Sequence, residues 1–462
     1  MKRGIYLAVD IGASSGRHLL GWVEDGRIQS REIHRFENRL IRKGGHRCWD
    51  IDALFGHVVE GLRRCAAAGM IPDSMGIDTW GLDFCLLDSD GSRLGEAISY
   101  RDARTAGIEP RVFERIPEVE LYERTGIQRM EINTIYQLAA LQMESPEDLQ
   151  RARHLLMIPD YLNYLLTGVM KQEYTNASTT QLVNAASREW DPELLQAMKL
   201  PSRLFGPLSQ PGERVGCLRK ELRQELGFDC EVILPPTHDT ASAVVATPIA
   251  DRERAVFLSS GTWSLIGMER TRPDCGEASR RHNFTNEGGV DGTWRYLKNI
   301  MGLWMLQSVR HELDDRYTFP QLSELAEQAA IDSVVDAQDA RLLAPESMSG
   351  TIRQLCAESG QAVPESPGEL ARVIYQSLAV GYRRAAEGLE QMVQHPLDVI
   401  HIVGGGSRDA FLNRLTAEAT GKQVIAGPVE ATAMGNLVIQ MLRCGEFPDL
   451  NAARTAIAHE LA

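Results

Sequence analysis

Small and polar residues follow a short apolar run near the start of the chain, from Val9 to Arg17 (Val-Asp-Ile-Gly-Ala-Ser-Ser-Gly-Arg). Glycine, alanine and serine let a ligand approach the backbone, and their N–H groups and hydroxyls can hold phosphate oxygens. Arg17 adds a fixed positive charge with a forked set of donors. Asp10 is placed to hold Mg²⁺ through water, because Mg²⁺ prefers oxygen ligands and keeps most of its hydration shell. The stretch suits a phosphate-binding turn, although an ordinary tight hairpin with a solvated aspartate has the same residues.

Two further turns of small residues occur in the second half of the chain. Residues 259–264 (Ser-Ser-Gly-Thr-Trp-Ser) join two apolar runs, as the first turn does. Gly404–Gly406 follow an apolar run and precede a helical pattern, which is a nucleotide-binding position in α/β proteins. No Gly-x-x-x-x-Gly-Lys-Ser/Thr motif occurs, which excludes the usual P-loop. One nucleoside triphosphate would explain all three turns, with the first two holding its phosphates and the third its nucleoside.

A polar cluster, Thr237-His-Asp-Thr240, ends the apolar run that begins at Cys230. Asp239 is our candidate general base, which would take the proton from a substrate hydroxyl as that oxygen attacks the γ-phosphorus. Its neighbours could orient a sugar. The alternatives are that Asp239 caps the following helix and that His238 is a hydrogen-bonded core histidine.

Other polar residues allow two interpretations each. Glu173–Gln181 is rich in hydroxyls and amides, so it could line a sugar pocket or form a well-bonded loop. Trp80 could be a sugar platform or a core residue, and the aspartates on either side of it could bind hydroxyls or close a turn. Arg101 and Arg104 could hold a substrate or lie in solvent.

Hydrophobic periodicity predicts strands that alternate with helices, with a parallel component to the sheet. The expected elements are a hairpin over 5–23 that turns at Asp25-Gly26, helices over 52–68, 134–143, 155–167, 241–245, 369–392 and 408–420, strands over 75–88, 255–260, 399–403 and 424–426, and a final helix over 433–442. The strand, turn and strand of 7–20 return at 255–267, which indicates a repeat of architecture and a boundary near residue 250. We therefore expect an N-terminal domain over 1–248 and a C-terminal domain over 249–462, with a ligand cleft between them.

The composition narrows the classes of function. The chain has 462 residues and a formal net charge of −14, so we expect neither nucleic-acid nor anionic-membrane binding. Its eight cysteines include no Cys-x-x-Cys pair, which favours free thiols in the cytoplasm. Neither an apolar leader nor an apolar run of about 18 residues occurs, so secretion and a membrane span are not expected. The oligomeric state is expected to be a monomer or a small homo-oligomer.

A series of segments, in order along nearly the whole chain, resembles the motifs of the FGGY carbohydrate kinases, which belong to the actin-like ATPase superfamily. Each segment alone is a weak signal, and their order and spacing carry the resemblance. Residue 237 is threonine where the family commonly has serine, and the chain ends at Ala462 where relatives often continue, so a C-terminal element is expected to be missing or dispensable. The segments are Ala8–Arg17, Gly76–Phe84, Tyr100–Arg104, Glu173–Ser178, Thr237–Val244, Leu258–Ser264, Asn286–Gly289, Lys298–Trp304, Ile402–Gly406 and Ala426–Ala431.

The resemblance implies an α/β fold of two actin-like (ribonuclease H-like) domains, each with a mixed sheet flanked by helices. It implies phosphorylation of the 1-hydroxyl of L-rhamnulose with ATP and Mg²⁺, in rhamnose breakdown. Another ketose, such as fuculose or xylulose, is the nearest alternative, and a non-catalytic nucleotide-gated sugar sensor is another. Carried over by position, Asp239 is the general base, and the binding residues are Ala13, Ser14, Ser15, Gly16, Arg17, Thr262, Gln307 and Gly405 for ATP, and Gly81, His238, Asp239, Thr240 and Asn299 for the sugar.

Overall fold

A computed structural model describes residues 3–343 and 345–461 of the chain. They form two compact units that alternate along the sequence. The first unit takes the chain up to Ala246, then Glu269–Tyr296, and then the chain from Ala431 onward, while the second unit takes Thr247–Met268 and Leu297–Glu430. A linear domain boundary at residue 248 stays a prediction.

A six-stranded mixed sheet forms the centre of the first unit. Its strands lie in the order β12 (Arg214–Cys217), β13 (Glu231–Ile233), β6 (Ser74–Thr79), β1 (Tyr6–Ile11), β2 (Ser15–Glu24) and β3 (Arg27–Glu37). Strand β1 is parallel to β6 and antiparallel to β2, and β6 is parallel to β13. The predicted hairpin of β1 and β2 is confirmed. Asp25 and Gly26, with φ of 51° and 75°, form the two-residue turn between β2 and β3, as the twist of such a turn requires.

In a second six-stranded sheet, the strands on either side of the first hairpin strand have the same directions as in the first sheet. Its order is β16 (Thr285–Gly288), β17 (Trp294–Met301), β15 (Trp263–Arg270), β14 (Ala255–Ser260), β18 (Val399–Val403) and β19 (Gln423–Ala426). Strand β14 is antiparallel to β15 and parallel to β18, which is parallel to β19. The first strand of each hairpin thus has an antiparallel partner on one side and a parallel partner on the other. The predicted repeat of architecture is confirmed.

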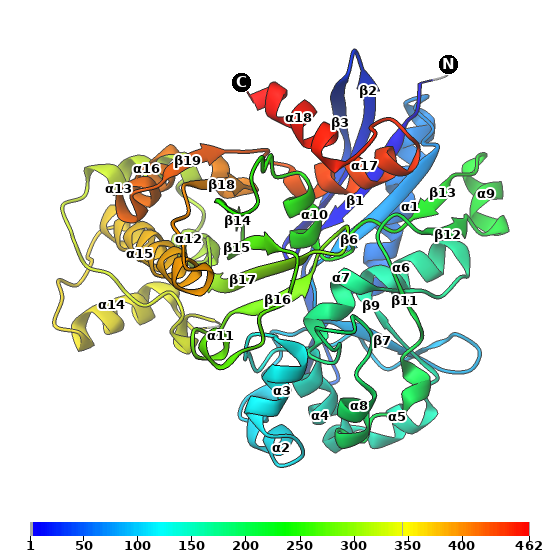
Figure 1. Cartoon of the computed structure of the whole chain (residues 1–462), viewed down its shortest axis with the longest axis horizontal. Coiled ribbons are helices and arrows are strands. Elements are labelled where there is room, and N and C mark those ends of the chain that lie inside the picture. Colours follow the sequence, from blue (N-terminus) through cyan, green and yellow to red (C-terminus); the bar gives the residue numbers. More distant parts are fainter. Residues whose placement is uncertain (1–2, 344, 462) are drawn as a thin grey trace. The chain divides into compact units, whose positions relative to one another are not determined.

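Helices and short strands complete the first unit. Helix α1 begins where Asp50 accepts a hydrogen bond from the Ala53 N–H, and its buried face repeats at Leu54, Val58 and Leu62 as expected. Helix α17 packs beside β1 and β6 (Figure 1). The helices are α1 (Ile51–Ala67), α2 (Glu109–Phe113), α3 (Glu118–Thr125), α4 (Thr134–Glu144), α5 (Pro146–Arg151), α6 (Ile158–Thr167), α7 (Tyr174–Ala177), α8 (Pro192–Ala197), α9 (Lys220–Leu226), α10 (Asp239–Val245), α11 (Glu277–Arg281), α17 (Ala431–Arg443) and α18 (Leu450–Leu461). The additional strands are β4 (Leu40–Lys43), β5 (His46–Trp49), β7 (Phe84–Leu87), β8 (Arg93–Leu94), β9 (His154–Met157), β10 (Gln172–Glu173) and β11 (Leu208–Ser209).

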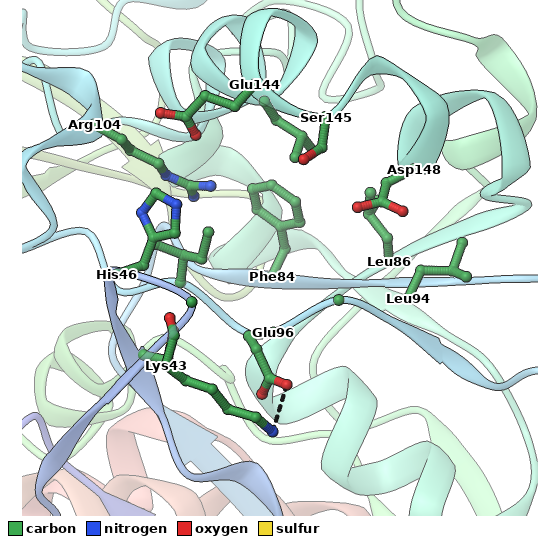
Figure 2. Close-up of a pocket in the computed structure, with 15 residues that line it drawn as sticks. Lys43, His46, Phe84, Leu86, Leu94, Glu96, Arg104, Glu144, Ser145 and Asp148 are labelled. Atoms are coloured by element: carbon green, nitrogen blue, oxygen red, sulfur yellow. Dashed lines mark hydrogen bonds and ion pairs between the residues drawn. The ribbon is translucent and has the colours of Figure 1, made fainter.

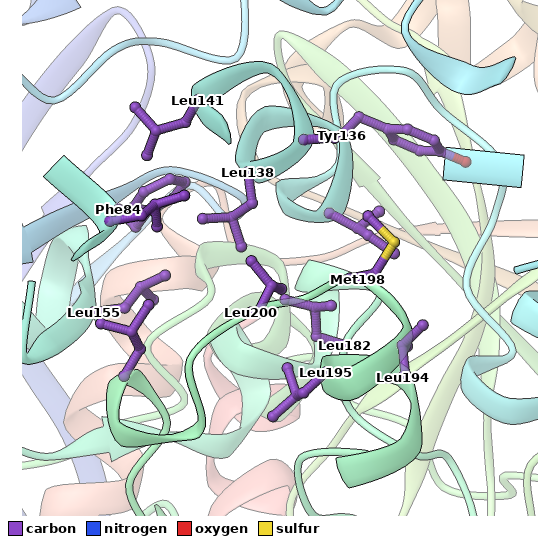
Figure 3. Close-up of a cluster of buried hydrophobic side chains, with 14 of the residues drawn as sticks. Phe84, Tyr136, Leu138, Leu141, Leu155, Leu182, Leu194, Leu195, Met198 and Leu200 are labelled. Atoms are coloured by element: carbon purple, nitrogen blue, oxygen red, sulfur yellow. The ribbon is translucent and has the colours of Figure 1, made fainter. Parts of the chain in front are cut away.

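A hydrophobic cluster in the first unit lies among helices α4 and α8 and strands β7 and β9 (Figure 3). Tyr136, Leu138, Leu182 and Leu194 in this cluster are fully buried. The cluster gives the loops that follow β6 a rigid support, because a close-packed interior holds its backbone in place.

Among the residues that the structure describes, five α-helices belong to the second unit. They are α12 (Trp304–Glu312), α13 (Phe319–Gln328), α14 (Met348–Glu358), α15 (Pro367–Val393) and α16 (Ala410–Thr420). The longest, α15, begins with a capping box in which Ser366 and Glu369 bond each other's backbone N–H groups. Its apolar face is buried, and it packs against α13 and α16 (Figure 1).

Three expectations about the elements are wrong. Residues 155–157 form the end of β9 rather than the start of a helix, because they pair with β7 in the sheet. The glycine run Gly404–Gly406 leads into a 3₁₀ turn, Gly405–Arg408, before α16 begins at Ala410. The helix predicted at 433–442 is not the last one, since α18 follows it. Within 3–343 and 345–461, no helix has both the length and the apolar character needed to cross a bilayer.

Candidate active site

The turn between β1 and β2, which we call the charged turn (Asp10–Arg17), is short and firmly held. The Gly12 N–H donates to the Ser15 carbonyl at 2.9 Å and closes it. Asn38, directly after β3, donates its side-chain N–H to the Gly12 carbonyl at 2.9 Å and its backbone N–H to the Ser14 carbonyl at 2.9 Å. In the described residues, the N–H groups of Ala13 and Ser14 donate to no backbone oxygen. These two donors are therefore available to a ligand.

Two carboxylates lie next to each other at the base of this turn. Asp10 on β1 is opposite Asp78 on the parallel strand β6, and their side chains are buried. Burial raises the pKa of Asp10 to about 6, while the charge of Arg17, whose Nε is 3.5 Å from Oδ2, opposes the rise and that of Asp239 adds to it. Burial, followed by the charge of Asp10, raises the pKa of Asp78 well above its usual range. The pair and Asp239 form one acidic cluster, in which the negative charges disfavour one another.

Helix α17 brings the end of the chain to this cluster. The Asn436 amide donates to Asp78 at 2.6 Å and to the Gly76 carbonyl at 3.1 Å. Gly435 lies so close to α10 that a Cβ there would be 1.7 Å from the Ser242 carbonyl oxygen. The helix therefore supports both the acidic strand end and the helix that carries Asp239.

Asp239 is placed by the segment that precedes α10. A parallel bridge joins His238 to Thr79 at the end of β6, where the Thr79 N–H donates to the Thr237 carbonyl at 2.9 Å. Asp239 then occupies the first position of α10. Its Oδ1 accepts from the backbone N–H and hydroxyl of Thr240 at 2.5 and 3.1 Å.

The carboxylate of Asp239 could cap α10 or serve as a general base. Residue 238 is the N-cap of α10, and no side chain caps the helix there. The carboxylate of Asp239 is 29% exposed, and its Oδ2 has no hydrogen-bond partner among the described side chains and backbone groups. Asp239 is therefore not the N-cap residue of α10, but its Oδ1 satisfies the Thr240 N–H in the first turn of the helix, as the capping interpretation expects. Its Oδ2 is free to accept a proton.

His238 lies between Asp239 and a buried ion pair. Its Nε2 is 3.5 Å from Asp239 Oδ1, and its Nδ1 is 3.1 Å from Nη2 of Arg295 and 3.3 Å from Oε2 of Glu287. Arg295 and Glu287 are 3.0 Å apart and are 1% and 4% exposed. Neither residue is among the site residues predicted from the sequence. The only signal is a charged residue inside an otherwise apolar strand, since Arg295 interrupts Trp-Arg-Tyr-Leu.

The hydroxyl-rich segment Glu173–Gln181 is well bonded, but it is helical rather than a loop, since it contains α7 and a 3₁₀ helix over Ser178–Thr180. Its hydroxyls are used internally, since Ser178, Thr179 and Thr180 each donate to a backbone carbonyl three residues earlier. Glu173 is fully buried and accepts from the backbone and hydroxyl groups of Thr175 and Thr237. Burial raises the pKa of Glu173. The segment holds the backbone just before Asp239 in place and does not itself present free hydroxyls.

The loop after β6 carries Gly81 against that segment. A Cβ at Gly81 would be 3.0 Å from the Thr179 hydroxyl oxygen, so the backbone approach is close. Trp80 is a core residue rather than a free platform, because it is 5% exposed and contacts Trp49 with ring centroids 4.0 Å apart. Both indole N–H groups donate to Asp83, at 2.6 and 2.9 Å. Asp83 thus holds the two rings in place.

The second unit has an equivalent turn, which we call the neutral turn (Ser259–Ser264). The Gly261 N–H donates to the Trp263 carbonyl at 2.9 Å. The backbone N–H groups of Leu303 and Trp304, at the start of α12, donate to the Gly261 and Thr262 carbonyls at 2.9 and 3.2 Å. Thr262 therefore lies at the N-terminal end of the helix that carries Gln307.

Each glycine of Gly404–Gly406 has a different surrounding. Gly404 has a φ of 83°, and a Cβ there would be 2.9 Å from the Ser260 carbonyl oxygen. A Cβ at Gly406 would be 2.0 Å from the Ser260 hydroxyl oxygen. A Cβ at Gly405 would meet nothing within 4 Å. Two of the glycines are thus needed for packing against the neutral turn, and only Gly405 faces open space.

The predicted site residues fall into two groups, one in each unit. The first unit brings together Asp10, Ala13, Ser14, Ser15, Gly16, Arg17, Gly81, His238, Asp239 and Thr240 around the C-terminal ends of β1 and β6. The second unit contains Thr262, Asn299, Gln307 and Gly405. Asn299 is on β17, where its carbonyl accepts from Gln338 at 3.5 Å.

A pocket of about 250 Å³ in the first unit contains none of the predicted site residues (Figure 2). Phe84, Leu86 and Leu94 form its apolar wall, and Lys43 pairs with Glu96 at its edge (Figure 2). Arg104 also lines it and donates to Gln137 at 2.8 Å, which in turn donates to Asp83 at 2.9 Å. Arg104 is thus neither solvated nor among the residues grouped around Asp239.

The residues at the charged turn fit a Mg²⁺ ion that keeps most of its water. Asp10 supplies one carboxylate. Burial and, to a smaller extent, the negative charge of Asp239 raise its pKa, and a bound cation would favour its ionised form. Among the residues the structure describes, no group of three or more histidine, cysteine, aspartate or glutamate side chains could hold a metal. A fully protein-ligated ion is therefore not supported, whereas one held by water and phosphates is compatible with this site.

Comparison with protein families gives two matches that follow each other along the chain. The model of the N-terminal domain of the FGGY family of carbohydrate kinases matches residues 5–246, and the model of its C-terminal domain matches residues 256–444. The chain belongs to the FGGY family of carbohydrate kinases. As a member, this FGGY kinase is an ATP-dependent sugar kinase.

Similar proteins cover nearly all of this FGGY kinase. It is 49% identical to a rhamnulokinase of Halalkalibacterium halodurans over 98% of this chain and 96% of that protein. It is 47% identical to a rhamnulokinase of Oceanobacillus iheyensis over the same shares, and 43% identical to one of Bacillus subtilis over 98% and 93%.

Solved structures share the fold at lower identity. A gluconate kinase of Lactobacillus acidophilus is 18% identical with a TM-score of 0.80, and a xylulose kinase of the same organism is 19% identical with a TM-score of 0.79. Each alignment covers 98% of this chain and 92% of the other chain. The expected fold of two α/β domains with mixed sheets flanked by helices is confirmed.

Proposed function

We propose that this FGGY kinase transfers the γ-phosphoryl group of ATP to the 1-hydroxyl of L-rhamnulose, giving L-rhamnulose 1-phosphate and ADP. The observation that carries the proposal is the identity of 43–49% to proteins named rhamnulokinase over 98% of this chain. In the reaction a bond forms between the sugar oxygen and the γ-phosphorus, the bond from that phosphorus to the β,γ-bridging oxygen breaks, and the hydroxyl proton goes to the enzyme.

Asp239 is the proposed acceptor of that proton. A base must lie within hydrogen-bond reach of the hydroxyl and must have an oxygen free to take the proton. The free Oδ2 and the 29% exposure of Asp239 meet the second condition. The bridge from His238 to Thr79 supports the role, since it fixes the backbone beside the charged turn.

The proposed ATP-binding residues come from both units. In the first unit, Ala13–Arg17 would bind phosphate oxygens through free N–H groups, hydroxyls and the Arg17 guanidinium. In the second unit the residues are Thr262, Gln307 and Gly405, and the open space at Gly405 leaves its backbone accessible. Asp10 would hold Mg²⁺ through water, and bound Mg²⁺ neutralises part of the phosphate charge.

The proposed sugar-binding residues are Gly81, His238, Asp239, Thr240 and Asn299. Gly81 would let the sugar approach the backbone, and His238 beside Asp239 would bind sugar oxygens. All eight cysteines are free, which supports the proposal that the enzyme works in the reducing cytoplasm. We keep a monomer or small homo-oligomer as the proposed state.

A coupled assay of ADP release over a panel of ketoses tests the substrate. The panel contains L-rhamnulose, L-fuculose, D-xylulose and D-fructose, with gluconate as an acid of the kind named in a structural relative. We expect L-rhamnulose to have the highest kcat/KM. The position of the phosphate on the product is read from ³¹P–¹H NMR coupling, which should identify C1.

The assay needs one control for contaminating ATPases. The Asp239→Asn variant, purified in the same way, should release little ADP with any sugar. A higher kcat/KM for another ketose than for L-rhamnulose would overturn the substrate assignment, and phosphate on another carbon would overturn the assignment of the 1-hydroxyl.

A further inference from the structure

We propose that Arg295 is a positioning residue that holds the imidazole of His238 in the tautomer with its proton on Nε2. The sugar site then has a fixed N–H donor beside the carboxylate of Asp239. The proposal rests on the proposed function only in that His238 contacts the sugar.

The contacts of Arg295 are all with the first unit and leave its guanidinium little freedom. Its Nη2 is hydrogen-bonded to His238 Nδ1 at 3.1 Å, and its Nε donates to the Gly288 carbonyl at 2.8 Å. Its Nη1 is 3.0 Å from Glu287 Oε2. The side chain is 1% exposed, so solvent does not compete for these contacts.

The chemistry of the two groups decides which nitrogen of His238 carries the proton. A guanidinium in a protein is always charged and can only donate hydrogen bonds. His238 Nδ1 must therefore accept from Arg295. A neutral imidazole has one donor and one acceptor nitrogen, so the proton is on Nε2.

Glu287 favours the other tautomer of His238, with the proton on Nδ1. Glu287 Oε2 is 3.3 Å from His238 Nδ1 and would accept a proton from that nitrogen if Arg295 were absent. Arg295 neutralises this carboxylate and occupies the Nδ1 lone pair at the same time. The tautomer of His238 therefore depends on Arg295.

The tautomer of His238 decides what its Nε2 offers to the sugar beside Asp239. His238 Nε2 is 3.5 Å from Asp239 Oδ1, so an N–H donor and a carboxylate acceptor lie next to each other. Two neighbouring oxygens of a polyhydroxy ligand match this pair, because one can accept from Nε2–H while the other donates to Asp239. With the proton on Nδ1, two acceptors would face the sugar, and the match would be lost.

The strands that carry Gly288 and Arg295, β16 and β17, are held firmly enough to keep Arg295 against His238. The Gly288 N–H donates to the Ser178 hydroxyl at 2.8 Å. A Cβ at Gly288 would be 2.4 Å from the ring of Tyr174, so the strand lies in direct contact with that ring. The backbone of His238 is held as well, since its N–H donates to the Thr175 hydroxyl at 3.4 Å.

Nitrogen-15 NMR of the full chain with labelled histidine tests the tautomer directly. The protein has 11 histidines, and the signals of His238 are assigned by their loss in His238→Gln. At pH 8 we expect the neutral form with the proton on Nε2 in the wild type. In Arg295→Met we expect the proton to move to Nδ1, toward Glu287. A proton on Nδ1 in the wild type, or an unchanged spectrum in Arg295→Met, would overturn the proposal.

Kinetics separate positioning from stability. We expect Arg295→Met to raise the KM for the sugar roughly 10-fold, the effect of one lost hydrogen bond, with the KM for ATP nearly unchanged. Arg295→Lys keeps a donor and should recover part of the loss. The matched control is Arg454→Met, since Arg454 is 3% exposed and pairs with buried Glu269 at 2.9 Å.

Arg295→Met and Arg454→Met should have the same effect on stability and different effects on sugar binding. Both methionine variants should lower the melting temperature, but only Arg295→Met should change the KM for the sugar. An equal rise in KM in both variants would show a merely structural role. If no ketose in the panel is turned over, the proposed function fails, while the NMR result still decides the tautomer.

Discussion

The charged turn and the neutral turn are built on one backbone plan. Each follows a strand that has an antiparallel neighbour on one side and a parallel neighbour on the other. Each is closed by a hydrogen bond from its glycine, Gly12 or Gly261, at 2.9 Å. Each is also held by a residue that follows the strand next to the second strand of its hairpin, which is Asn38 after β3 in one case and Leu303 after β17 in the other.

The side chains on this shared plan differ in charge. The charged turn has Asp10 beside Asp78 on the parallel strand. In the neutral turn the residue two positions before the glycine is Ser259, and its partner on the parallel strand is Val403. Ser264 shares a hydrogen bond of 2.7 Å with the Tyr382 hydroxyl, so a hydroxyl rather than a charged group contacts this turn there.

The difference shows how one backbone plan can serve two purposes. Ionised groups in one unit can hold a metal and take up a proton, whereas hydroxyls and backbone N–H groups in the other can bind a neutral or anionic ligand without adding charge. The acidic cluster is also a cost to folding, because buried like charges disfavour each other. We therefore expect substitutions in the first unit to affect chemistry and pH dependence, and those in the second to affect binding and packing.

The largest effect should come from Asp239→Asn. The amide cannot accept the hydroxyl proton, so kcat should fall by roughly 10²–10⁴-fold, the usual share of a general base. ATP binding, measured by titration calorimetry, should be nearly unchanged. Asp332→Asn, at an exposed position, is the control. Wild-type turnover in Asp239→Asn would remove Asp239 from its role.

The second largest effect should be on the requirement for Mg²⁺, tested at the equivalent positions Asp10 and Ser259 of the two turns. Asp10→Asn should raise the Mg²⁺ concentration needed for half-maximal activity roughly 10–100-fold, as expected for the loss of an outer-shell partner of a metal. Ser259→Ala should leave this concentration unchanged. Equal responses of the two variants would contradict the assignment of Mg²⁺ to the charged turn.

Stability should depend on pH through Asp10. Burial raises its pKa from 3.8 to about 6, so the folded protein holds this proton more tightly than the unfolded chain. Stability from this group is therefore full below pH 3.8 and is lost as the pH rises through 6. Urea unfolding should find Asp10→Asn more stable than the wild type at pH 8, by up to about 3 kcal/mol.

The same measurement at pH 4.5 gives the control. There the advantage of Asp10→Asn should shrink to about 1 kcal/mol or less, since the carboxyl is mostly protonated in the folded state. Ser259→Ala should show no such change between the two pH values. An advantage that stays constant with pH would contradict the raised pKa.

Two neighbouring glycines of the second unit should respond differently. Gly404→Ala forces a positive φ on alanine and a contact with Ser260, so it should lower the free energy of unfolding by about 1–3 kcal/mol. Gly405→Ala has open space and should change stability by less than about 0.5 kcal/mol, while the KM for ATP rises. Thermal unfolding and ATP titration in parallel measure both. An unchanged KM for ATP in Gly405→Ala would contradict its proposed role.

The smallest effect should come from the residue that holds the charged turn. Asn38→Ala removes the side-chain bond to the Gly12 carbonyl and should lower stability by about 1 kcal/mol, with a modest rise in the KM for ATP. Glu37→Ala, next to it and exposed, is the control. Truncating Leu303 cannot do the same to the neutral turn, because Leu303 holds that turn through its backbone N–H.

Local signals in the sequence predicted most of the elements and the positions of the three turns. Alternating apolar residues predicted the hairpin strands, and Asp25-Gly26 predicted the turn between β2 and β3, because these preferences act between residues close in the chain. Family motifs predicted the fold and the class of reaction, and the two family models match the chain in order, over residues 5–246 and 256–444.

Contacts between distant segments were decided by the tertiary structure alone. Asn436 bonds Asp78 across 358 positions, and Arg295 bonds His238 across 57. Neither pair could be predicted from hydrophobic periodicity in the sequence, because a hydrogen bond between distant segments depends on how the sheets and helices pack. The sequence by itself thus determined which residues could do the chemistry, whereas only the packing of the chain decided which buried partners set their charge and orientation.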